Sequence, residues 1–294
     1  KSLYDPDANL MRNTVETLAA TVSGADIISL YPHDFRYSEP TAFGQRMAVN
    51  IQHLLRNEGH LQRVRNPVDG SYFLESVISQ LAEKAWALFL KIEKGGGYRK
   101  SELVNAAKQF HSNVKEKEQG LLRQERVVVG TTRYANPLER IDASQVRHHD
   151  QAKSGITLWE NIRLTIDGLT EAKQPGIAIL APQTGNNAEV SKKITFITGI
   201  ITSLGLDIPP PIHSLKEILA EDLPDLLIVC ADETWYQSHL ASVATKSELS
   251  SVLKIAVGRS PILYELRQQA VINEVLNAKS NLTAFLGMIN KLLS

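Results

Sequence analysis

The sequence predicts an α/β fold, and three features of the chain indicate it. Hydrophobic residues make up 43% of the 294 residues, which is enough for two domains with real cores. In the last third of the chain, short β-branched runs alternate with helical runs. Near the N-terminus, the order of a helix, a buried strand and another helix is typical of the same class. These observations predict parallel strands covered by helices.

The N-terminal part is predicted to begin with a helix at Asp5-Pro6, because an N-cap residue there precedes a proline. This helix ends before Gly24. The short β-branched run 25–30 is predicted to be a buried strand. A second amphipathic helix is predicted from about residue 40 to residue 59.

The middle of the chain is predicted to be helical and then irregular. A long amphipathic helix continues to about Ile92, and Gly95-Gly96-Gly97 is interpreted as its cap. A polar helix follows over about 101–124. From 134 to 153 the sequence loses its period and is interpreted as a linker or a wrapping segment.

The last third has the clearest pattern. Strands are predicted at 177–181, 226–230, 253–257 and 271–276, with a weaker strand at 206–208 before three prolines. Helices are predicted at about 188–204, 233–243, 261–268 and 282–293. Five strands separated by helices fit a doubly wound parallel sheet of flavodoxin-like size. A ligand is expected at the carboxyl ends of its first and third strands.

The charge balance argues against a nucleic-acid partner. Lys plus Arg and Asp plus Glu number 32 each. Residues 1–150 carry 20 basic and 18 acidic groups, a net charge of +2, and residues 151–294 carry 12 and 14, a net charge of −2. Neither half is a basic module of the kind that binds nucleic acids.

The single cysteine, Cys230, cannot form an internal disulfide, and no apolar run approaches the ~20 residues that a membrane span needs. We therefore expect a reducing cytoplasm and no membrane association. Cys230 closes an apolar strand and is expected to be a small buried hydrophobe. The first residues show no signal pattern, and the chain looks like part of something longer.

Motifs that carry chemistry are scarce. Thr184-Gly185-Asn186-Asn187 follows a predicted strand, but with one glycine it is better interpreted as an N-capping turn than as a phosphate loop. The eight histidines lack metal-ligand spacing, and no metal site is expected. The densest group, His148-His149-Asp150, is interpreted as a solvated linker. Asp232 and Glu233 are interpreted as helix caps.

A long motif in the first third of the chain is more specific. Arg63-Val64-Arg65-Asn66-Pro67-Val68-Asp69-Gly70-Ser71-Tyr72 is followed by Leu81-Ala82-Glu83-Lys84-Ala85-Trp86 and by Ile92-Glu93-Lys94-Gly95-Gly96-Gly97. With Asp5-Pro6, Gly24-Ala25-Asp26, Arg46, Asn50 and Gln52, these segments closely resemble the cobalamin-dependent acyl-CoA mutases, methylmalonyl-CoA mutase above all. The resemblance is strong over residues 4–98 and moderate over 176–294.

The resemblance implies an architecture in three parts. Residues 1–125 would be the C-terminal part of a (β/α)8 barrel with flanking helices, 126–170 a helical linker, and 171–294 a flavodoxin-like sheet resembling a cobalamin-binding domain. A full barrel takes ~250 residues, so the chain would begin near the last barrel units. A barrel reduced to its last units would leave unpaired strand edges, and we expect another segment or another chain to cover them.

Two family sites are altered in this sequence. After the last barrel strand, active mutases carry a sequence similar to Phe-Asp-Glu-Ala, whose glutamate faces the cofactor. In this chain Phe35 stands at the position of that glutamate, and Arg36 follows it. Active members also carry Asp-x-His-x-x-Gly after the first strand of the second domain, and that histidine is the lower ligand of cobalt. The matching turn here contains Gln183, Thr184, Gly185, Asn186 and Asn187, with no histidine. These seven positions define the expected vestigial cleft.

Both losses together favour a non-catalytic member, since function depends on the site and not on the fold. The resemblance implies the small subunit of a heterodimeric bacterial enzyme of propionate metabolism. Its catalytic large subunit would bind adenosylcobalamin and interconvert methylmalonyl-CoA and succinyl-CoA, an isomerase reaction, by radical rearrangement. This chain would hold no cofactor, no metal and no catalytic residue. The alternatives are an active acyl-CoA mutase with atypical cobalamin binding, or a ligand-sensing flavodoxin-like module.

Overall fold

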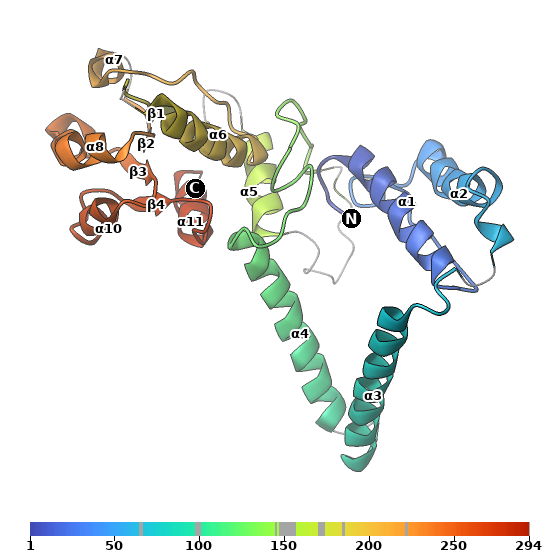
Figure 1. The fold of residues 1–294 in the computed structure, drawn as a ribbon. Helices are drawn as coiled ribbons and strands as arrows, with labels where there is room; N and C mark the ends of the chain where they lie inside the picture. The colour runs from blue at the N-terminus through green and yellow to red at the C-terminus, as the bar shows by residue number, and fades with distance from the viewer. Residues whose placement is uncertain are drawn as a thin grey trace. The chain divides into compact units, whose positions relative to one another are not determined.

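The computed structural model describes residues 1–64, 67–97, 101–144, 146, 157–169, 174–183, 186–220 and 223–293 (Figure 1). The chain divides into two compact units. The first comprises Lys1, 7–35 and 39–119, and the second comprises 2–6, 36–38 and 120–294. Within the described ranges, no helix has the length and apolar character needed to cross a bilayer.

Helices form the described framework of the first unit. They are α1 (Pro6–Val22), α2 (Ala42–Asn57), α3 (Tyr72–Lys94) and most of α4 (Ser101–Leu122), with a 3₁₀ turn at Leu61–Arg63. The predicted helices are thus confirmed. The glycine cap is confirmed as well, because the Gly97 N–H donates to the Ile92 carbonyl at 3.0 Å and Gly97 has a φ of +77°.

Helix α1 buries its polar face and exposes its apolar one. Asn9 and Asn13 are buried, and their side-chain amides donate to the carbonyls of His33 at 3.1 Å and Tyr31 at 3.0 Å. Met11 and Val15 lie on the opposite face, each 64% exposed. The first unit therefore leaves these apolar side chains of α1 uncovered.

The prediction of a buried strand at 25–30 is wrong. This segment belongs to no β ladder in the described chain, and Ile27 is 89% exposed. A strand is stable only when its backbone N–H and C=O groups pair with a neighbouring strand. The described sheet lies in the second unit, so a β-branched run alone does not produce a strand here.

The second unit contains a parallel sheet. Its strands are β1 (Ile177–Leu180), β2 (Leu226–Val229), β3 (Leu253–Val257) and β4 (Glu274–Leu276), hydrogen-bonded in that order. The strand predicted over 271–276 is shortened at its start, because residues 270–273 form a turn in which Ala270 has a φ of +58°. The strands predicted at 177–181, 226–230 and 253–257 agree with β1, β2 and β3 to within one residue.

The weak strand expected at 206–208 does not form. Instead Ile212, after the prolines, pairs with β1: its N–H donates to the Ile179 carbonyl at 2.8 Å and its carbonyl accepts from Ala181 at 2.8 Å. Pro209 to Pro211 have no N–H to donate, so the pairing is confined to a single bridge beyond them. The predicted five strands thus become four strands and one bridge.

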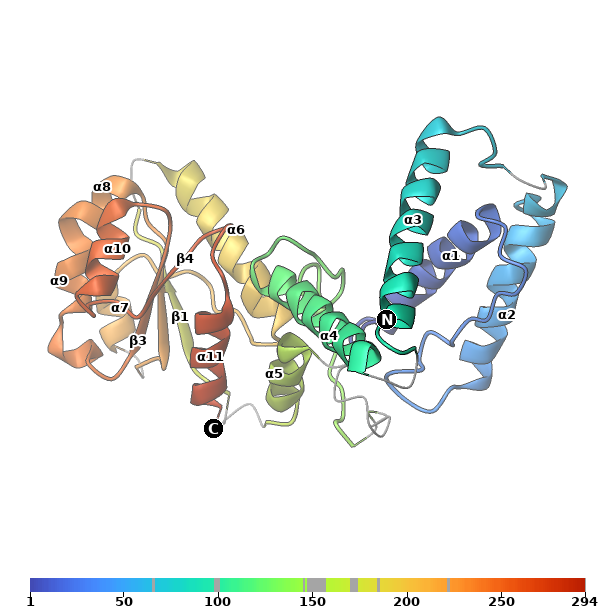
Figure 2. The ribbon, with the colours of Figure 1, turned by 90° about the horizontal axis from the view of Figure 1, so that it is seen from below.

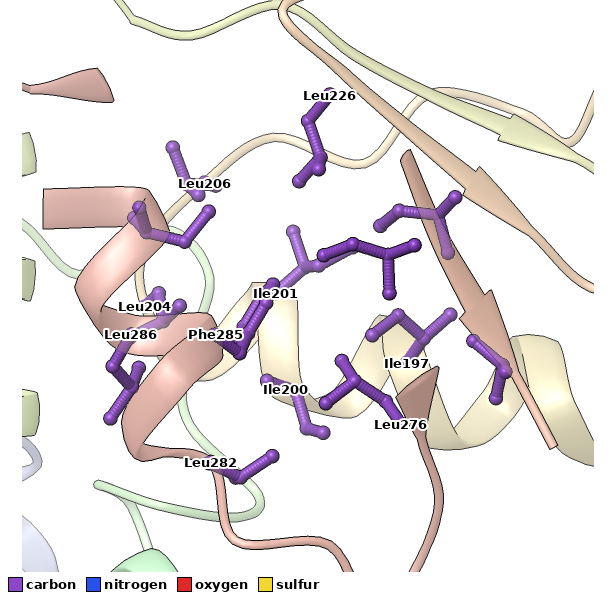
Figure 3. Packing of buried hydrophobic residues seen from close by; sticks show 14 of the residues in the cluster. Ile197, Ile200, Ile201, Leu204, Leu206, Leu226, Leu276, Leu282, Phe285 and Leu286 are labelled. Carbon is purple, nitrogen blue, oxygen red and sulfur yellow. The ribbon is translucent and has the colours of Figure 1, made fainter. Parts of the chain in front are cut away.

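Helices cover both faces of this sheet (Figure 2). On one face lie α5 (Leu158–Asp167), α6 (Asn187–Ser203) and α11 (Thr283–Leu292). On the other face lie α7 (Leu215–Ala220), α8 (Glu233–Trp235), α9 (Ala241–Ala244) and α10 (Pro261–Gln268). In Figure 3 the α6 and α11 side chains meet over the sheet, with Ile201 against Phe285, both fully buried. This packing is the main core of the unit.

The N-terminal residues 2–6 belong to the second unit through a buried polar cluster. The Tyr4 hydroxyl donates to Asp167 at 2.6 Å, and the Asp5 N–H donates to Glu139 at 2.9 Å. The Arg163 guanidinium lies 3.9 Å from the centre of the Tyr4 ring. Burial raises the pKa of Tyr4, and its bond to Asp167 adds to the shift, so the hydroxyl stays protonated.

Candidate functional site at the carboxyl edge of the sheet

The strand order places a candidate site between the carboxyl ends of β1 and β2. Ile212 pairs with β1 on one side and β2 pairs with it on the other, so the direction of winding reverses at β1. Ligands of open α/β sheets bind where the winding reverses, outside the carboxyl ends of the strands. Here the edge is formed by the turn after β1, by Ala231 and Asp232 after β2, and by Gly258 after β3.

The turn after β1 caps a helix. The Asn186 side-chain oxygen accepts from the Glu189 N–H at 3.2 Å and so caps α6, which confirms the capping interpretation. Gln183, Asn186 and Asn187 are exposed. Thr184 and Gly185 lie outside the described residues. From Gln183 to Glu189 the sequence contains no imidazole.

The Tyr236 hydroxyl ties the ends of β2 and β3 together. Tyr236 is 1% exposed, and its oxygen accepts from the Ala231 N–H at 3.0 Å. The same oxygen lies 2.7 Å from the Val257 carbonyl and 3.0 Å from the Val229 carbonyl. Burial raises the pKa of Tyr236, so the group stays a neutral phenol. Tyr236 begins a five-residue π-helical turn between α8 and α9, which inserts an extra residue at this point.

The ammonium group of Lys193 occupies the same edge. Its Nζ donates to the Ala231 carbonyl at 2.7 Å and pairs with Glu189 at 2.6 Å. It also lies 4.9 Å from the centre of the Tyr236 ring. A Cβ added at Gly258 would lie 3.4 Å from this Nζ. The Lys193 ammonium and the Tyr236 ring therefore occupy space at the ends of β2 and β3.

The carboxylates and the thiol of this edge have structural roles. Asp232 is the N-cap of α8 and accepts from the Trp235 N–H at 2.9 Å, as the sequence indicated. Glu233 accepts from the Ser260 hydroxyl at 2.5 Å. Cys230 is buried and unpaired as predicted, and burial raises the pKa of its thiol to about 12. A thiol with such a pKa is inert at neutral pH.

One histidine that sequence reasoning left without a role lies at this edge. His213 Nδ1 is 2.7 Å from the Ala181 carbonyl, at the end of β1. A carbonyl can only accept, so Nδ1 is the donor of this bond, and Nε2 has no hydrogen-bond partner among the described residues. The signal in the sequence was its position directly after the residue that pairs with β1, and this pairing becomes visible only in the fold.

The other half of the predicted cleft belongs to a separate turn. Phe35 lies in the first unit and its ring centre is 4.5 Å from that of Tyr31. Arg36 lies in the second unit, 3.8 Å from Glu160. Asp34, which matches the aspartate of the family's Phe-Asp-Glu-Ala, accepts from the Thr41 hydroxyl at 2.6 Å. This bond supports the start of α2.

Comparison with known proteins decides the family. The family model described as methylmalonyl-CoA mutase matches residues 1–170, more than half of the chain. The chain belongs to the methylmalonyl-CoA mutase family. This agrees with the motifs of the first third of the chain.

Several curated relatives are small subunits of methylmalonyl-CoA mutases. The chain is 25% identical over 309 residues to the methylmalonyl-CoA mutase small subunit of Porphyromonas gingivalis, covering 99% of this chain and 49% of the relative. It is 26% identical to the small subunit of Streptomyces virginiae over 85% of the chain and 42% of the relative. The methylmalonyl-CoA mutase of Escherichia coli is 33% identical over 55% of the chain and 23% of the relative. The chain thus spans about half the length of the small subunits it matches.

The turn after β1 does not fit the lower face of the family's cobalamin. A lower ligand needs an imidazole whose second nitrogen is held in place, and this turn contains no histidine. The ammonium of Lys193 has no lone pair for cobalt while it is protonated. Among the described residues, no cluster of three or more His, Cys, Asp or Glu side chains is arranged to hold a metal ion.

Proposed function

We propose that this chain is part of a non-catalytic small subunit that supports an adenosylcobalamin-dependent methylmalonyl-CoA mutase. The cofactor and the interconversion of methylmalonyl-CoA and succinyl-CoA belong to a catalytic large subunit, the heterodimer partner. The observation that carries the proposal is the carboxyl edge of the sheet, where Lys193 and Tyr236 fill the space and Asn186 caps a helix in place of the axial imidazole.

The proposal includes the architecture implied by the family. Residues 1–125 derive from the end of a (β/α)8 barrel, 126–170 from the linker, and 171–294 from a flavodoxin-like domain of the cobalamin-binding type. The strand order, with a bridge on the outer side of β1, supports the last assignment. The similarity to small subunits over 99% of the chain supports the whole.

The exposed apolar side chains of the first unit support a role in assembly. Helix α3 has no buried residue among those described, and Leu81, Trp86 and Phe89 are 66%, 62% and 48% exposed. Met11 and Val15 of α1 are similarly uncovered. Contiguous exposed apolar surface of this kind marks an interface. In the proposal these faces pack against the rest of the longer subunit and against the large subunit.

Association with a large subunit tests the proposal. We expect the chain to co-elute from a size-exclusion column with a large subunit that retains Asp-x-His-x-x-Gly, while mutase activity requires the large subunit. A Leu81→Asp variant should weaken this complex at least about tenfold, because it places a charge in an apolar interface. Glu83→Gln on the same helix is the matched control and should bind unchanged. Absence of a complex, or turnover by this chain alone, contradicts the proposal.

His213 is the observation that favours the alternative of an active mutase with atypical cobalamin binding. Its free Nε2 could ligate cobalt, because the other nitrogen is held by a carbonyl as in many metal-ligating histidines. A His213→Ala variant distinguishes the two hypotheses. Under our proposal it should leave complex formation and the mutase activity of the heterodimer unchanged. Under the alternative it should abolish cofactor binding by this chain.

A further inference from the structure

A pocket with mainly apolar walls lies in the second unit, away from the carboxyl edge of the sheet. A cavity of about 410 Å³ lies beneath the loop 124–135 and against α5 and α6. Its apolar lining includes Leu121, Trp159, Phe196 and Ile200, the last labelled in Figure 3. This volume falls within the range of about 300–1,000 Å³ that is usual for small-molecule sites, which combine apolar walls with a few polar groups.

Two arginines, Arg126 and Arg133, are among the residues that line this pocket. Arg126 and Arg133 are exposed, and neither side chain has a hydrogen-bond or ion-pair partner in the described part of the chain. A guanidinium binds carboxylates through paired, charge-assisted hydrogen bonds. Two cations without partners beside an apolar space therefore favour a ligand that has an anionic head and an apolar body.

The loop that carries Arg133 is held in place before any ligand binds. The Val128 N–H donates to the Thr132 hydroxyl at 2.9 Å, and the Gly130 N–H donates to the Arg133 carbonyl at 2.8 Å. Gly130 has a φ of +78°, and a Cβ there would lie 2.4 Å from the Asp5 side chain, so only glycine fits. A pre-formed loop binds a ligand without the cost of ordering it.

The residues that line the pocket include an exposed helical glycine with open space beside it. A Cβ built at Gly199 of α6 meets no atom within 4 Å. Glycine inside a helix is destabilising relative to residues with a side chain, and here no close packing requires it. The missing side chain leaves this part of α6 open, in a pocket that Trp159 and Ile200 also line.

We propose that this cavity binds an amphipathic carboxylate, with the apolar body against Trp159, Phe196 and Ile200 and the carboxylate at Arg126 and Arg133. The site is separate from the carboxyl edge of the sheet and does not depend on the proposed role in the mutase. It gives the second unit a binding activity of its own.

Octanoate is the probe for this site, and octan-1-ol is the neutral analogue. In the full chain with Trp86→Phe and Trp235→Phe, tryptophan fluorescence reports only on Trp159. We expect a saturable change with octanoate and binding at least about tenfold weaker with octan-1-ol, because the alcohol cannot form the charge-assisted bonds. Equal affinities for the two probes, or no saturable change with octanoate, would overturn the proposal.

Variants in matched pairs assign the head and the body of the ligand. The combined Arg126→Gln and Arg133→Gln variant should lose about tenfold in octanoate affinity and keep its affinity for octan-1-ol, while Arg123→Gln, outside the cavity, should change neither. Gly199→Leu should abolish binding of both probes by filling the space. Gly287→Leu, at an exposed helical glycine that also has open space, should retain binding. Unchanged octanoate binding in Gly199→Leu contradicts the assignment.

Discussion

Gly44, in the first turn of α2, shows how closely one residue can be constrained. A Cβ at this position would lie 2.4 Å from Asp34 Oδ1, nearer than real contacts allow. Gly44→Ala should therefore displace the Asp34 carboxylate from Thr41 and lower the free energy of unfolding by about 1–3 kcal/mol. Urea unfolding measures this. Gly287→Ala is the control, since its Cβ meets open space, and should stabilise by about 0.5–1 kcal/mol. A neutral or stabilising Gly44→Ala would contradict the packing described.

Glu139, in the buried cluster at Tyr4, should make stability depend on pH. Burial raises the pKa of Glu139 above its usual 4.5, although the Asp5 N–H and Arg163 oppose the shift. A group whose folded pKa is raised contributes stability at low pH and loses it as the pH rises through the folded value. Unfolding free energies measured from pH 4 to pH 7 should show this decline in the wild type, and Glu139→Gln should lack it. A wild-type advantage that grows with pH would refute the assignment.

Asp34 should contribute a pH dependence of stability opposite in sign to that of Glu139, and it serves as the matched control. Burial alone would raise its pKa, but the two hydrogen bonds from Thr41 outweigh burial and hold the pKa below the usual 3.8. Its contribution is present above that value and is lost as the pH falls. The difference in stability between the wild type and Asp34→Asn should therefore grow as the pH rises from acid, opposite to the Glu139 difference.

At the scale of elements, the π-helical turn after α8 presents Tyr236 to two strand ends. Tyr236→Phe keeps the ring but leaves the buried Ala231 N–H without its acceptor, which should cost about 1–3 kcal/mol in unfolding free energy. Tyr264→Phe is the control, because the Tyr264 hydroxyl is part of an exposed contact with Asn277, and its effect should stay within about 0.5 kcal/mol. Equal losses of unfolding free energy in the two variants would show that the Tyr236 hydroxyl does not stabilise the carboxyl edge of the sheet.

Local pattern was sufficient for most elements. The helices α6 and α10 and the strands β2 and β3 follow from continuous apolar runs, apolar period and capping residues. The run 25–30 has the same β-branched character but lacks a partner strand, and pairing is a property of the fold that composition does not record. The prolines before Ile212 likewise moved the pairing to where an N–H was available.

The candidate site was only partly predictable. The absence of an imidazole in the turn after β1 is written in the sequence, as is the cap at Asn186. The groups that fill the edge are not, because Lys193 and the carbonyl it binds are 38 residues apart and meet only when α6 packs beside β2. The role of His213 depends in the same way on one long-range bridge.

At the scale of the whole molecule, the two units differ in how completely they cover their apolar residues. The sheet of the second unit is covered on both faces, whereas in the first unit α3 buries none of its residues and Met11 and Val15 of α1 are exposed. Soluble proteins rarely leave large contiguous apolar patches uncovered unless a partner binds them. The neutral net charge and these faces are together consistent with a chain that associates through apolar contact and not through charge.

Titration of the full chain with adenosylcobalamin, followed by visible absorption, tests the central claim most directly. If Lys193 and Tyr236 fill the carboxyl edge and no imidazole serves cobalt, the spectrum should be the sum of its components, with no saturable change at one equivalent. Stoichiometric binding with a change in the lower ligand of cobalt, lost again in His213→Ala, would contradict the account and establish the chain as a cobalamin-binding subunit.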